Sequence, residues 1–312
     1  MTTPTTYRQP AYVASTADLL AVAEAIHTQW QQVGATGHLL AQNLDTTAEF
    51  GFDVDNAVPL ASVAKVPLAL VVLDEIATGV LDPATPVTID PETKSVGPTG
   101  VAAFRHPVTI AVGDLLHQML TVSDNASADA LLDLVDVQTI DARLREWGCD
   151  GVRLRHRLQR MYECVAGVAG DDFGLAMELA IRDDAVGLYS IETLDPAHAN
   201  AGTARALVDL LQRIWLDRIS QPSATAELRR LMGMQLFKHR LSSDLQLDTV
   251  RVSGKTGTFL HLRHEIGVIT SDSGDRIAIA ALTRSQRRAD IAHDIDLAIG
   301  SAARTAFEAL RT

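Results

Sequence analysis

The stretch VPLASVAKVPLALVV, residues 58–72, decides how this chain folds. Ser62 and Lys65 stand three positions apart at the head of this apolar run, so on a helix their side chains lie on one face. A serine hydroxyl needs a base beside it to attack at neutral pH, and a lysine amine serves when burial or a second cation lowers its pKa. The free N–H groups at a helix N-terminus also favour a developing oxyanion. The stretch therefore predicts a buried helix that begins with a serine nucleophile and its base.

Taken alone, the Ser-x-x-Lys pattern is weak evidence, since a chain of this length contains roughly one such match by chance. The plain alternative is an exposed lysine one turn into a core helix. Two later motifs change this weighting, namely Ser123-Asp124-Asn125 in TVSDNASADALLDLV and Lys255-Thr256-Gly257 in VRVSGKTGTFL. Singly, the first reads as a helix cap and the second as a strand end that enters a turn. In this order, the three motifs define a known set of serine hydrolases.

The sequence patterns near both termini predict a sheet that is flanked by an N-terminal and a C-terminal helix. Ser15 or Thr16 caps an amphipathic helix that ends near Gly34, and strand-like pieces follow at 38–42 and 49–54. Near the C-terminus the apolar pattern changes to period two, which indicates antiparallel strands. These strands are VRVSGKTG, HEIGVIT and RIAIAALT, and they precede a long amphipathic helix over RRADIAHDIDLAIGSAARTAFEAL.

The middle of the chain is mostly helical. Short strands are expected in PVTIDP and HPVTI, and helices at 113–119, from about Ala126 with Asp124 or Asn125 as cap, over 161–186 and after the cap Thr203. We therefore predict an α/β (α+β) fold in one domain, residues 1–312, with a five-stranded, mainly antiparallel sheet flanked by the terminal helices. The α/β part covers about 10–57 and 245–312, and a mostly helical part covers about 58–244.

Composition excludes several classes of function. The chain has 312 residues, 47% of them hydrophobic, and a formal charge of −12, which argues against nucleic acid or an anionic membrane as the main partner. The basic run RLRHRLQR is expected to be a solvated helix face. The first residues contain no signal-peptide pattern, so a cytoplasmic protein is expected. Cys149 and Cys164 are expected to be reduced thiols, although one disulfide is conceivable. No sequence pattern indicates a cofactor or a metal site.

The three motifs and the order of elements together resemble the class A β-lactamases and their penicillin-binding relatives over nearly the whole chain. Ser62 and Ser123 are 61 positions apart, close to the usual gap in that family. Ser123 and Lys255 are 132 positions apart, which is longer than usual, so we expect an insertion within residues 140–200.

The resemblance implies a role for each matching residue. Ser62 would be the acylated nucleophile, Lys65 its base, and Ser123 the group that passes a proton to the leaving group. Asn125 would position the substrate and Lys65, and Lys255 would supply positive charge that lowers the pKa of Lys65. On the last motif, Thr256 would bind the substrate carboxylate, Gly257 would let the substrate lie along the strand, and the N–H of Thr258 would form the oxyanion hole with that of Ser62.

The departures from the family are equally informative. Class A β-lactamases carry a glutamate, a few residues ahead of an asparagine, which activates the deacylating water. Here Glu163 has no asparagine after it, and Glu192 is followed by Asp195 in that place; both remain candidates for the deacylation base, Glu192 being the better placed. Arg263 is the candidate for the family's carboxylate-binding arginine. His261 and His264 are three apart on an expected strand, so they face opposite sides and make a poor metal pair.

These observations leave two functions open. The first is a serine hydrolase that acts through Ser62 on a small-molecule substrate, either a β-lactam, which is turned over poorly without the glutamate, or a small ester or amide. The second is a non-catalytic or slow-turnover ligand-binding protein that keeps the cleft. An α/β-hydrolase is disfavoured, because Leu60 and Ala64 stand where that fold places glycines around its nucleophile.

Overall fold

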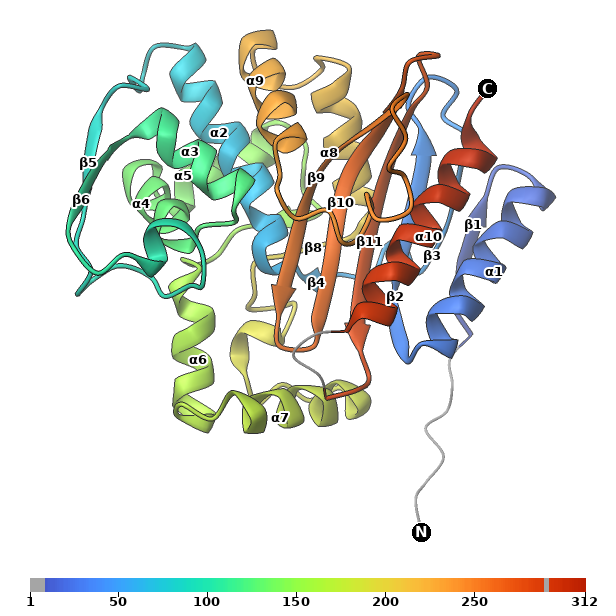
Figure 1. The fold of residues 1–312 in the computed structure, drawn as a ribbon, viewed down its shortest axis with the longest axis horizontal. Coiled ribbons are helices and arrows are strands. Elements are labelled where there is room, and N and C mark those ends of the chain that lie inside the picture. Colours follow the sequence, from blue (N-terminus) through green and yellow to red (C-terminus); the bar gives the residue numbers. More distant parts are fainter. Residues whose placement is uncertain (1–8, 289–291) are drawn as a thin grey trace.

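A six-stranded antiparallel sheet forms the centre of the chain (Figure 1). The computed structural model describes residues 9–288 and 292–312. The strand order is β1-β3-β2-β11-β10-β9, which brings the first and last parts of the sequence together. The strands are β1 (Tyr12–Ala14), β2 (Ala35–Asn43), β3 (Glu49–Phe52), β9 (Val250–Phe259), β10 (Leu262–Ser271) and β11 (Arg276–Ser285). The predicted antiparallel sheet is confirmed, with β1 as a sixth strand because Tyr12–Ala14 pairs with β3.

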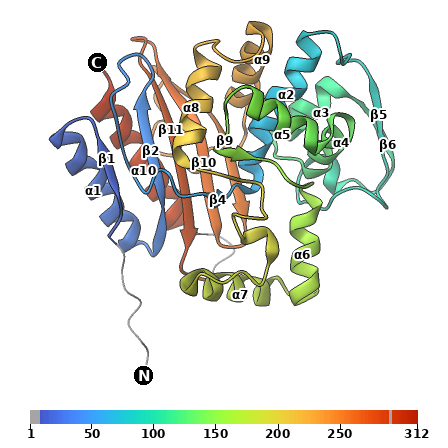
Figure 2. The same cartoon turned by 180° about the vertical axis from the view of Figure 1, so that it is seen from behind.

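Helices cover both faces of this sheet. The terminal helices α1 (Ala17–Gln32) and α10 (His293–Leu310) pack on one face, where Trp30 is buried and its ring nitrogen donates to the Ala298 carbonyl. Thr16 caps α1, as predicted, by accepting from the N–H of Leu19. Helix α8 (Ala204–Trp215) covers the opposite face, as the view from behind shows (Figure 2). Buried apolar residues accordingly form two clusters, one on each side of the sheet.

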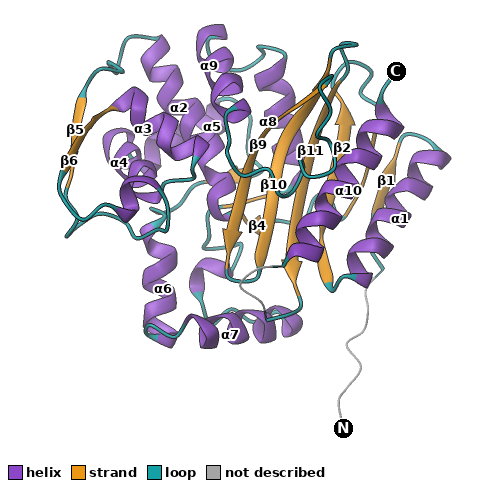
Figure 3. Cartoon of the chain, in the orientation of Figure 1, coloured by secondary structure: helices purple, strands orange, loops and turns teal. Residues whose placement is uncertain are grey.

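Helix α2 (Lys65–Ala77) is the core of the helical part (Figure 3). All of its residues from Lys65 to Asp74 are buried, because it lies between the sheet and a ring of other helices. The ring contains α3 (Val112–Thr121), α4 (Asn125–Val135), α5 (Val137–Glu146) and α9 (Pro222–Gly233). The two predicted short strands are confirmed: β5 (Pro86–Ile89) and β6 (Val108–Ala111) pair antiparallel and lie outside these helices.

The stretch that decides the fold does not form one continuous helix from its start, and this corrects the prediction. Val58–Pro59 form the short strand β4, which pairs with β8 (Ala201–Gly202), and Ala61–Ala64 form the 3-10 helix η1 that leads into α2. Ala61 has a φ of 47°, a left-handed conformation that an α-helix cannot continue through. Ser62 therefore sits in a tight turn ahead of α2.

Most of the chain that lies below the sheet in the view of Figure 1 belongs to residues 140–200. Helix α6 (Gln159–Ala169) runs down from the helical part, and α7 (Phe173–Val186) passes beneath the ends of the strands (Figure 1). The single helix predicted for 161–186 is divided at Gly170, whose φ of 57° ends α6. The segment also holds the two-residue strand β7 (Val152–Arg153) and the 3-10 turn η3 (Glu192–Leu194). Whether it is an insertion stays a prediction.

Three further observations concern the C-terminal helix, the two cysteines and membrane-spanning helices. The last predicted helix was expected from residue 287; it begins at His293, and 289–291 lie outside the described residues. Both Cys149 and Cys164 are buried free thiols. Over residues 9–288 and 292–312, no helix combines the length and the apolar character needed to cross a membrane.

Candidate active site

A pocket of about 280 Å³ opens where η1, the start of α4 and strand β9 meet. It brings together side chains that are separated by almost 200 positions in the sequence, because the edge strand β9 packs directly against η1. The residues that line it are Ser62, Pro98, Thr99, Ser123, Asn125, Tyr162, Phe237, His239, Thr256 and Thr258. Five of the sequence candidates, from all three motifs, therefore share one cavity.

Lys65 does not line this pocket itself, but its buried amine contacts three residues that do. Its Nζ is 3.1 Å from Ser62 Oγ, 2.6 Å from the Ser123 carbonyl oxygen and 2.7 Å from Asn125 Oδ1. A carbonyl oxygen and an amide oxygen only accept hydrogen bonds, so they fix two N–H bonds of the amine. A neutral Lys65 then keeps its lone pair for the hydroxyl proton of Ser62. This geometry is that of a nucleophile and its base.

The burial of Lys65 favours this neutral form. Its side chain is fully buried, and desolvation lowers the pKa of Lys65 to about 7, although the carboxylates of Asp124 and Asp129 act in the opposite direction. A base whose pKa is near the operating pH has the best combination of basicity and availability. The predicted base is therefore in reach of the Ser62 hydroxyl, and with a pKa of about 7 a substantial share of it is neutral at physiological pH.

Ser123 stands between the two buried lysines. Its Oγ is 3.2 Å from Lys65 Nζ and 3.0 Å from Lys255 Nζ, so one hydroxyl links both amines. Burial is the main cause that lowers the pKa of Lys255, and the positive charge of Lys65 lowers it further. A hydroxyl held by two amines can receive a proton from one side while it gives one away on the other. Ser123 is therefore in contact with both amines, and its predicted role in proton transfer stays a prediction.

Both serines of the pocket are tied to strained backbone. Ser123 has a φ of 60°, and Ala61, next to the nucleophile, has a φ of 47°. Non-glycine residues in this region cost about 1–3 kcal/mol each, and they persist where the surrounding structure holds them. Around Ser123 the support comes from Asp124, which is completely buried and accepts from the N–H groups of Val101, Ala102 and Ala126.

Asn125 connects the lysine to the opposite wall of the pocket. While Oδ1 accepts from Lys65, Nδ2 donates to the carbonyl oxygen of Val96 at 2.9 Å and to the Tyr162 hydroxyl at 3.3 Å. Both N–H groups and one lone pair of this amide are therefore occupied, which fixes its orientation. The predicted positioning role of Asn125 toward Lys65 has a direct geometric basis.

The outer edge of β9 forms the remaining wall. The N–H of Thr256 points away from β10 and donates to Gln235 Oε1 at 2.7 Å. Because alternate N–H groups of a strand point to the same side, the N–H of Thr258 also points outward at this edge. At Gly257 a Cβ would stand 2.8 Å from the Leu60 carbonyl oxygen, so glycine is needed for η1 to approach the strand. Its predicted role toward the substrate stays a prediction.

Three buried polar residues, Arg240, Gln235 and Glu265, lie behind β9 and were missed by sequence reasoning. Arg240 donates to Thr258 Oγ1 and to the carbonyl oxygen of Gly257, and it pairs with Asp296 at 2.6 Å. Gln235 bridges the hydroxyl of Thr256 and the carboxyl of Glu265, whose pKa is raised by burial. None of the three stands in a motif, and the only signal was a polar residue inside an otherwise apolar pattern.

The candidate deacylation bases lie outside the pocket. Glu192, in η3, pairs with Arg160 at 2.6 Å, and half of its side chain is exposed. Glu163 is on α6 with a similarly exposed side chain and is 3.8 Å from the same arginine. No aspartate or glutamate lines the cavity that contains Ser62 among the residues that the structure describes. The spacing placed both glutamates near this wall, but their side chains point to the surface.

Tyr162 is the side chain of α6 that faces the pocket instead. Its hydroxyl accepts from Asn125, its ring packs edge-on against Phe259 at 5.6 Å, and burial raises the pKa of Tyr162. A phenol that stays protonated is a poor base. Sequence reasoning passed over Tyr162 although it directly precedes the candidate Glu163.

Arg263 does not line the pocket either. Its guanidinium is buried and donates to the carbonyl oxygens of Leu260 and Leu262 in the β9–β10 turn. His264 donates through Nε2 to the Pro59 carbonyl oxygen at 3.0 Å, so it helps to hold the segment that carries Ser62. His261 lies in the turn before β10 and not on the strand, which corrects the predicted placement.

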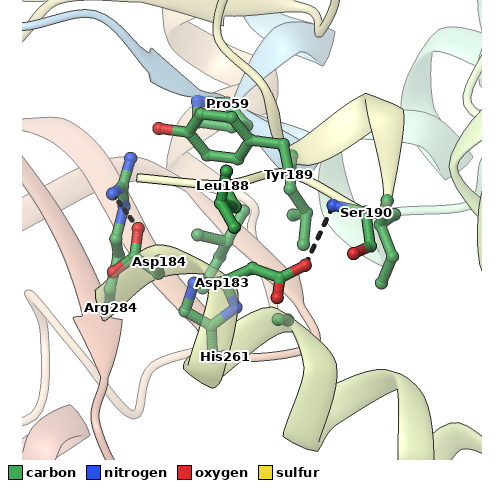
Figure 4. A pocket seen from close by; sticks show the side chains of 12 residues that line it. Pro59, Asp183, Asp184, Leu188, Tyr189, Ser190, His261 and Arg284 are labelled. Atoms are coloured by element: carbon green, nitrogen blue, oxygen red, sulfur yellow. Dashed lines mark hydrogen bonds and ion pairs between the residues drawn. The ribbon is translucent and has the colours of Figure 1, made fainter. Parts of the chain in front are cut away.

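A second, much smaller cavity lies between α7 and the neighbouring ends of β10 and β11 (Figure 4). Arg284 pairs there with Asp184, while Asp183 accepts from the N–H of Ser190. Neither ring nitrogen of His261 has a hydrogen-bond partner among the described residues, and burial lowers the pKa of His261 to about 3. The space, about 10 Å³, is close to what one water needs.

Nowhere in 9–288 or 292–312 do three or more His, Cys, Asp or Glu side chains form a metal-binding group.

Comparisons with known proteins agree with this fold. Residues 21–310 match the model of the "Beta-lactamase enzyme family". The chain is 37% identical over 292 residues, 89% of this chain and 94% of the other, to the beta-lactamase regulatory protein BlaB of Streptomyces cacaoi. Among solved structures, it resembles an ancestral class A β-lactamase (TM-score 0.74, 22% identity, 93% of this chain and 100% of that one). It also resembles the L158E mutant of PBP-A, an acyl-enzyme complex with penicillin G (TM-score 0.73, 17% identity, 93% and 96%).

Proposed function

Because this chain belongs to the beta-lactamase enzyme family, we propose that it is a serine hydrolase whose Ser62 is acylated by a β-lactam or by a small ester or amide, and whose acyl-enzyme clears slowly. The observation that carries the first half of this proposal is the contact between Lys65 Nζ and Ser62 Oγ at 3.1 Å. The second half rests on the absence of a carboxylate from the described lining of the pocket.

Acylation proceeds through groups that are already in contact. Lys65 takes the hydroxyl proton of Ser62 as Oγ bonds to the substrate carbonyl carbon, and the oxyanion forms between the N–H groups of Ser62 and Thr258. Removing one such donor commonly costs several kcal/mol of transition-state stabilisation. When the intermediate collapses, the C–N or C–O bond breaks, Ser123 gives its proton to the leaving group, and the protonated Lys65 restores the proton on Ser123.

Deacylation needs a water and a base that takes its proton. The wall from which a carboxylate would act carries Tyr162, whose phenol remains protonated, and Glu192 is held at the surface by Arg160. Lys65 is the only titratable group in direct contact with Ser62 among the described residues, and it serves the first step. Slow clearance is therefore expected, and a good acyl donor should accumulate as an adduct.

A ligand-binding or regulatory role is the second candidate, and the same wall favours it. A pocket that is acylated quickly and cleared slowly records the presence of its ligand. The relative from Streptomyces cacaoi is named as a regulatory protein, and this name supports such a role without assigning it. The two candidates differ in one measurable quantity, the rate at which the adduct on Ser62 disappears.

Intact-protein mass spectrometry over time tests both candidates. The protein is mixed with benzylpenicillin in one series and with p-nitrophenyl acetate in the other, and the site is located by peptide mapping. We expect an adduct on Ser62 with both reagents, persistent for penicillin and shorter-lived for the acetyl group. Ser62→Ala must abolish both adducts. Fast clearance of both would overturn slow deacylation and support an efficient hydrolase, and no adduct with either would overturn the acylation itself.

A further inference from the structure

We propose that a groove between the start of α6 and the loop at 192–198 binds a small phosphate compound, such as pyrophosphate or a phosphate ester. The groove has a volume of about 420 Å³, which is typical of small-molecule sites. It shares no lining residue with the pocket that contains Ser62, so the inference does not depend on the proposed acylation. The lining residues that carry the argument are Arg155, Arg157, Arg160, Glu163, Glu192 and Thr193.

Three arginines reach this groove from the basic run RLRHRLQR, residues 153–160. The run does not form the solvated helix face that was predicted, because only its last two residues belong to α6. Arg153 ends β7, and residues 154–158 form a connecting loop. Arg155, Arg157 and Arg160 are exposed. Guanidinium groups bind phosphate oxygens through parallel N–H groups, so this concentration of arginines favours a phosphate ligand.

Arg155 has no carboxylate partner. Its Nη1 donates to the Ala199 carbonyl oxygen at 2.6 Å, and it forms no ion pair with any residue that the structure describes. Arg157 and Arg160, by contrast, pair with Asp133 and Glu192. The backbone contact holds the Arg155 guanidinium in place and leaves its other N–H groups for a ligand.

The hydroxyl of Thr193 is a second unused group of the groove. Thr193 lines the groove, only 3% of the residue is exposed, and its Oγ1 has no hydrogen-bond partner among the described residues. A buried hydroxyl without a partner costs free energy, and a ligand oxygen that accepts from it removes this cost. The groove therefore contains a donor that the folded chain itself does not use.

Hydrogen bonds within the chain fix the backbone around the arginines. Asn200 Oδ1 accepts from the N–H groups of Arg155 and His156 at 2.7 and 3.2 Å, and Asn200 Nδ2 donates to the His156 carbonyl oxygen. Farther along the loop, the buried carboxylate of Asp129 accepts from the N–H of Leu158 at 2.6 Å. A site held in its binding shape loses less conformational entropy when a ligand enters.

Two carboxylates limit what the groove can accept. Glu163 and Glu192 line it together with the arginines, and Glu192 pairs with Arg160 at 2.6 Å. Three arginines and two glutamates leave one net positive charge, and the pKa of His156 is lowered, mainly by burial, so that this ring adds none at neutral pH. The formal charge of −12 on the whole chain disfavours a nucleic acid or an anionic membrane surface. A compact anion that enters the groove and displaces Glu192 from Arg160 fits these charges.

Isothermal titration calorimetry with the full-length protein and inorganic pyrophosphate tests the site. We expect a dissociation constant of about 0.1–1 mM, as a few charge-assisted hydrogen bonds in a groove open to water would give. No heat of binding up to about 10 mM pyrophosphate would overturn the proposal. Vesicles that contain phosphatidic acid should leave the protein in the supernatant on centrifugation. Cosedimentation that Arg155→Gln abolishes would overturn the assignment to a soluble ligand.

Three variants locate the ligand. Arg155→Gln should weaken pyrophosphate binding about tenfold, because it removes a charged donor. Thr193→Val keeps the shape and removes the hydroxyl. It should weaken binding about threefold without lowering the midpoint of thermal unfolding, since that hydroxyl has no partner to lose. Glu192→Gln should strengthen binding about threefold, because Arg160 is then no longer held by a carboxylate.

Arg218→Gln is the matched control. Arg218 is an exposed arginine between α8 and α9 that, like Arg155, forms no ion pair within the described part of the chain and lines neither cavity. This variant should bind pyrophosphate as the unmodified protein does. Equal weakening by Arg218→Gln and Arg155→Gln would indicate a general effect of charge and would overturn the groove. Binding that none of the three groove variants changes, or that Glu192→Gln weakens, would overturn it as well.

Discussion

The two walls of the catalytic pocket differ in the number of side chains that can accept or donate a proton at Ser62. On one side, the buried amines of Lys65 and Lys255 and the half-buried hydroxyl of Ser123 are joined by hydrogen bonds of about 3 Å to Ser62 or to each other. On the other side, α6 presents Tyr162 to the pocket and holds Glu163 toward solvent. Under the proposed function, forming an acyl-enzyme and releasing it would therefore depend on separate parts of this fold.

Of the substitutions that test this difference between the walls, loss of Lys65 should change the measured rate most. We expect Lys65→Ala to slow acylation of Ser62 by about 10³-fold, because a positioned general base contributes about 10²–10⁴-fold. Adduct formation with p-nitrophenyl acetate, followed by intact mass, measures the change. Lys65→Arg serves as the control that keeps the positive charge, and it should lose a similar factor because an arginine stays protonated. If arginine restores the rate, Lys65 acts by charge and not as a base.

A carboxylate introduced on the other wall should change release and not formation. We expect Tyr162→Glu to speed the loss of a penicillin adduct by about 10²-fold, the low end of general-base catalysis. Glutamate is shorter than tyrosine, so its carboxylate leaves room for a water beside the acyl-enzyme. Tyr162→Gln has the same shape without the charge and should clear the adduct no faster than the unmodified protein. If both variants lose the adduct equally fast, the faster clearance does not come from a carboxylate that acts as a base.

The pH dependence of acylation should report Lys65. Only its neutral form accepts the proton of Ser62, and its pKa is lowered to about 7, so the rate rises with pH through about 7 and is constant above about 8. The acylation rate at pH 6 should be about tenfold lower than at pH 9. Stopped-flow release of p-nitrophenol measures the profile, with the far-UV circular dichroism recorded at each pH. A rate that falls as the pH rises toward 8 would contradict a neutral-lysine base.

Glu192 should matter least. Its side chain is half exposed and paired with Arg160 at the surface, and exposed pairs contribute about 0–1 kcal/mol. We expect Glu192→Gln to leave both formation and clearance of the penicillin adduct within about twofold of the unmodified protein, as measured by the same mass assay. A tenfold or greater slowing of clearance would restore Glu192 as the deacylation base and would mean that η3 moves after acylation.

The sequence by itself determined the three motifs, their order and the sheet. Local spacing places Ser62 beside Lys65, and period-two patterns with capping residues such as Thr16 and Thr203 identify strands and helices from short segments. These features follow from backbone geometry that each segment carries with it. For the same reason, the resemblance to class A β-lactamases could be stated from the sequence.

Only the tertiary structure decided which side chains face the pocket. The turn at Ala61, the role of Gly257 against Leu60, and the burial of Arg240 depend on contacts between segments far apart in the sequence. The same holds for Tyr162, which enters the pocket while its neighbour Glu163 points outward. Adjacent residues of a helix differ in direction by about 100°, so a helix that rotates by one position exchanges the two. That rotation is set by packing, because the sheet, α4 and α6 must together exclude water from their apolar surfaces.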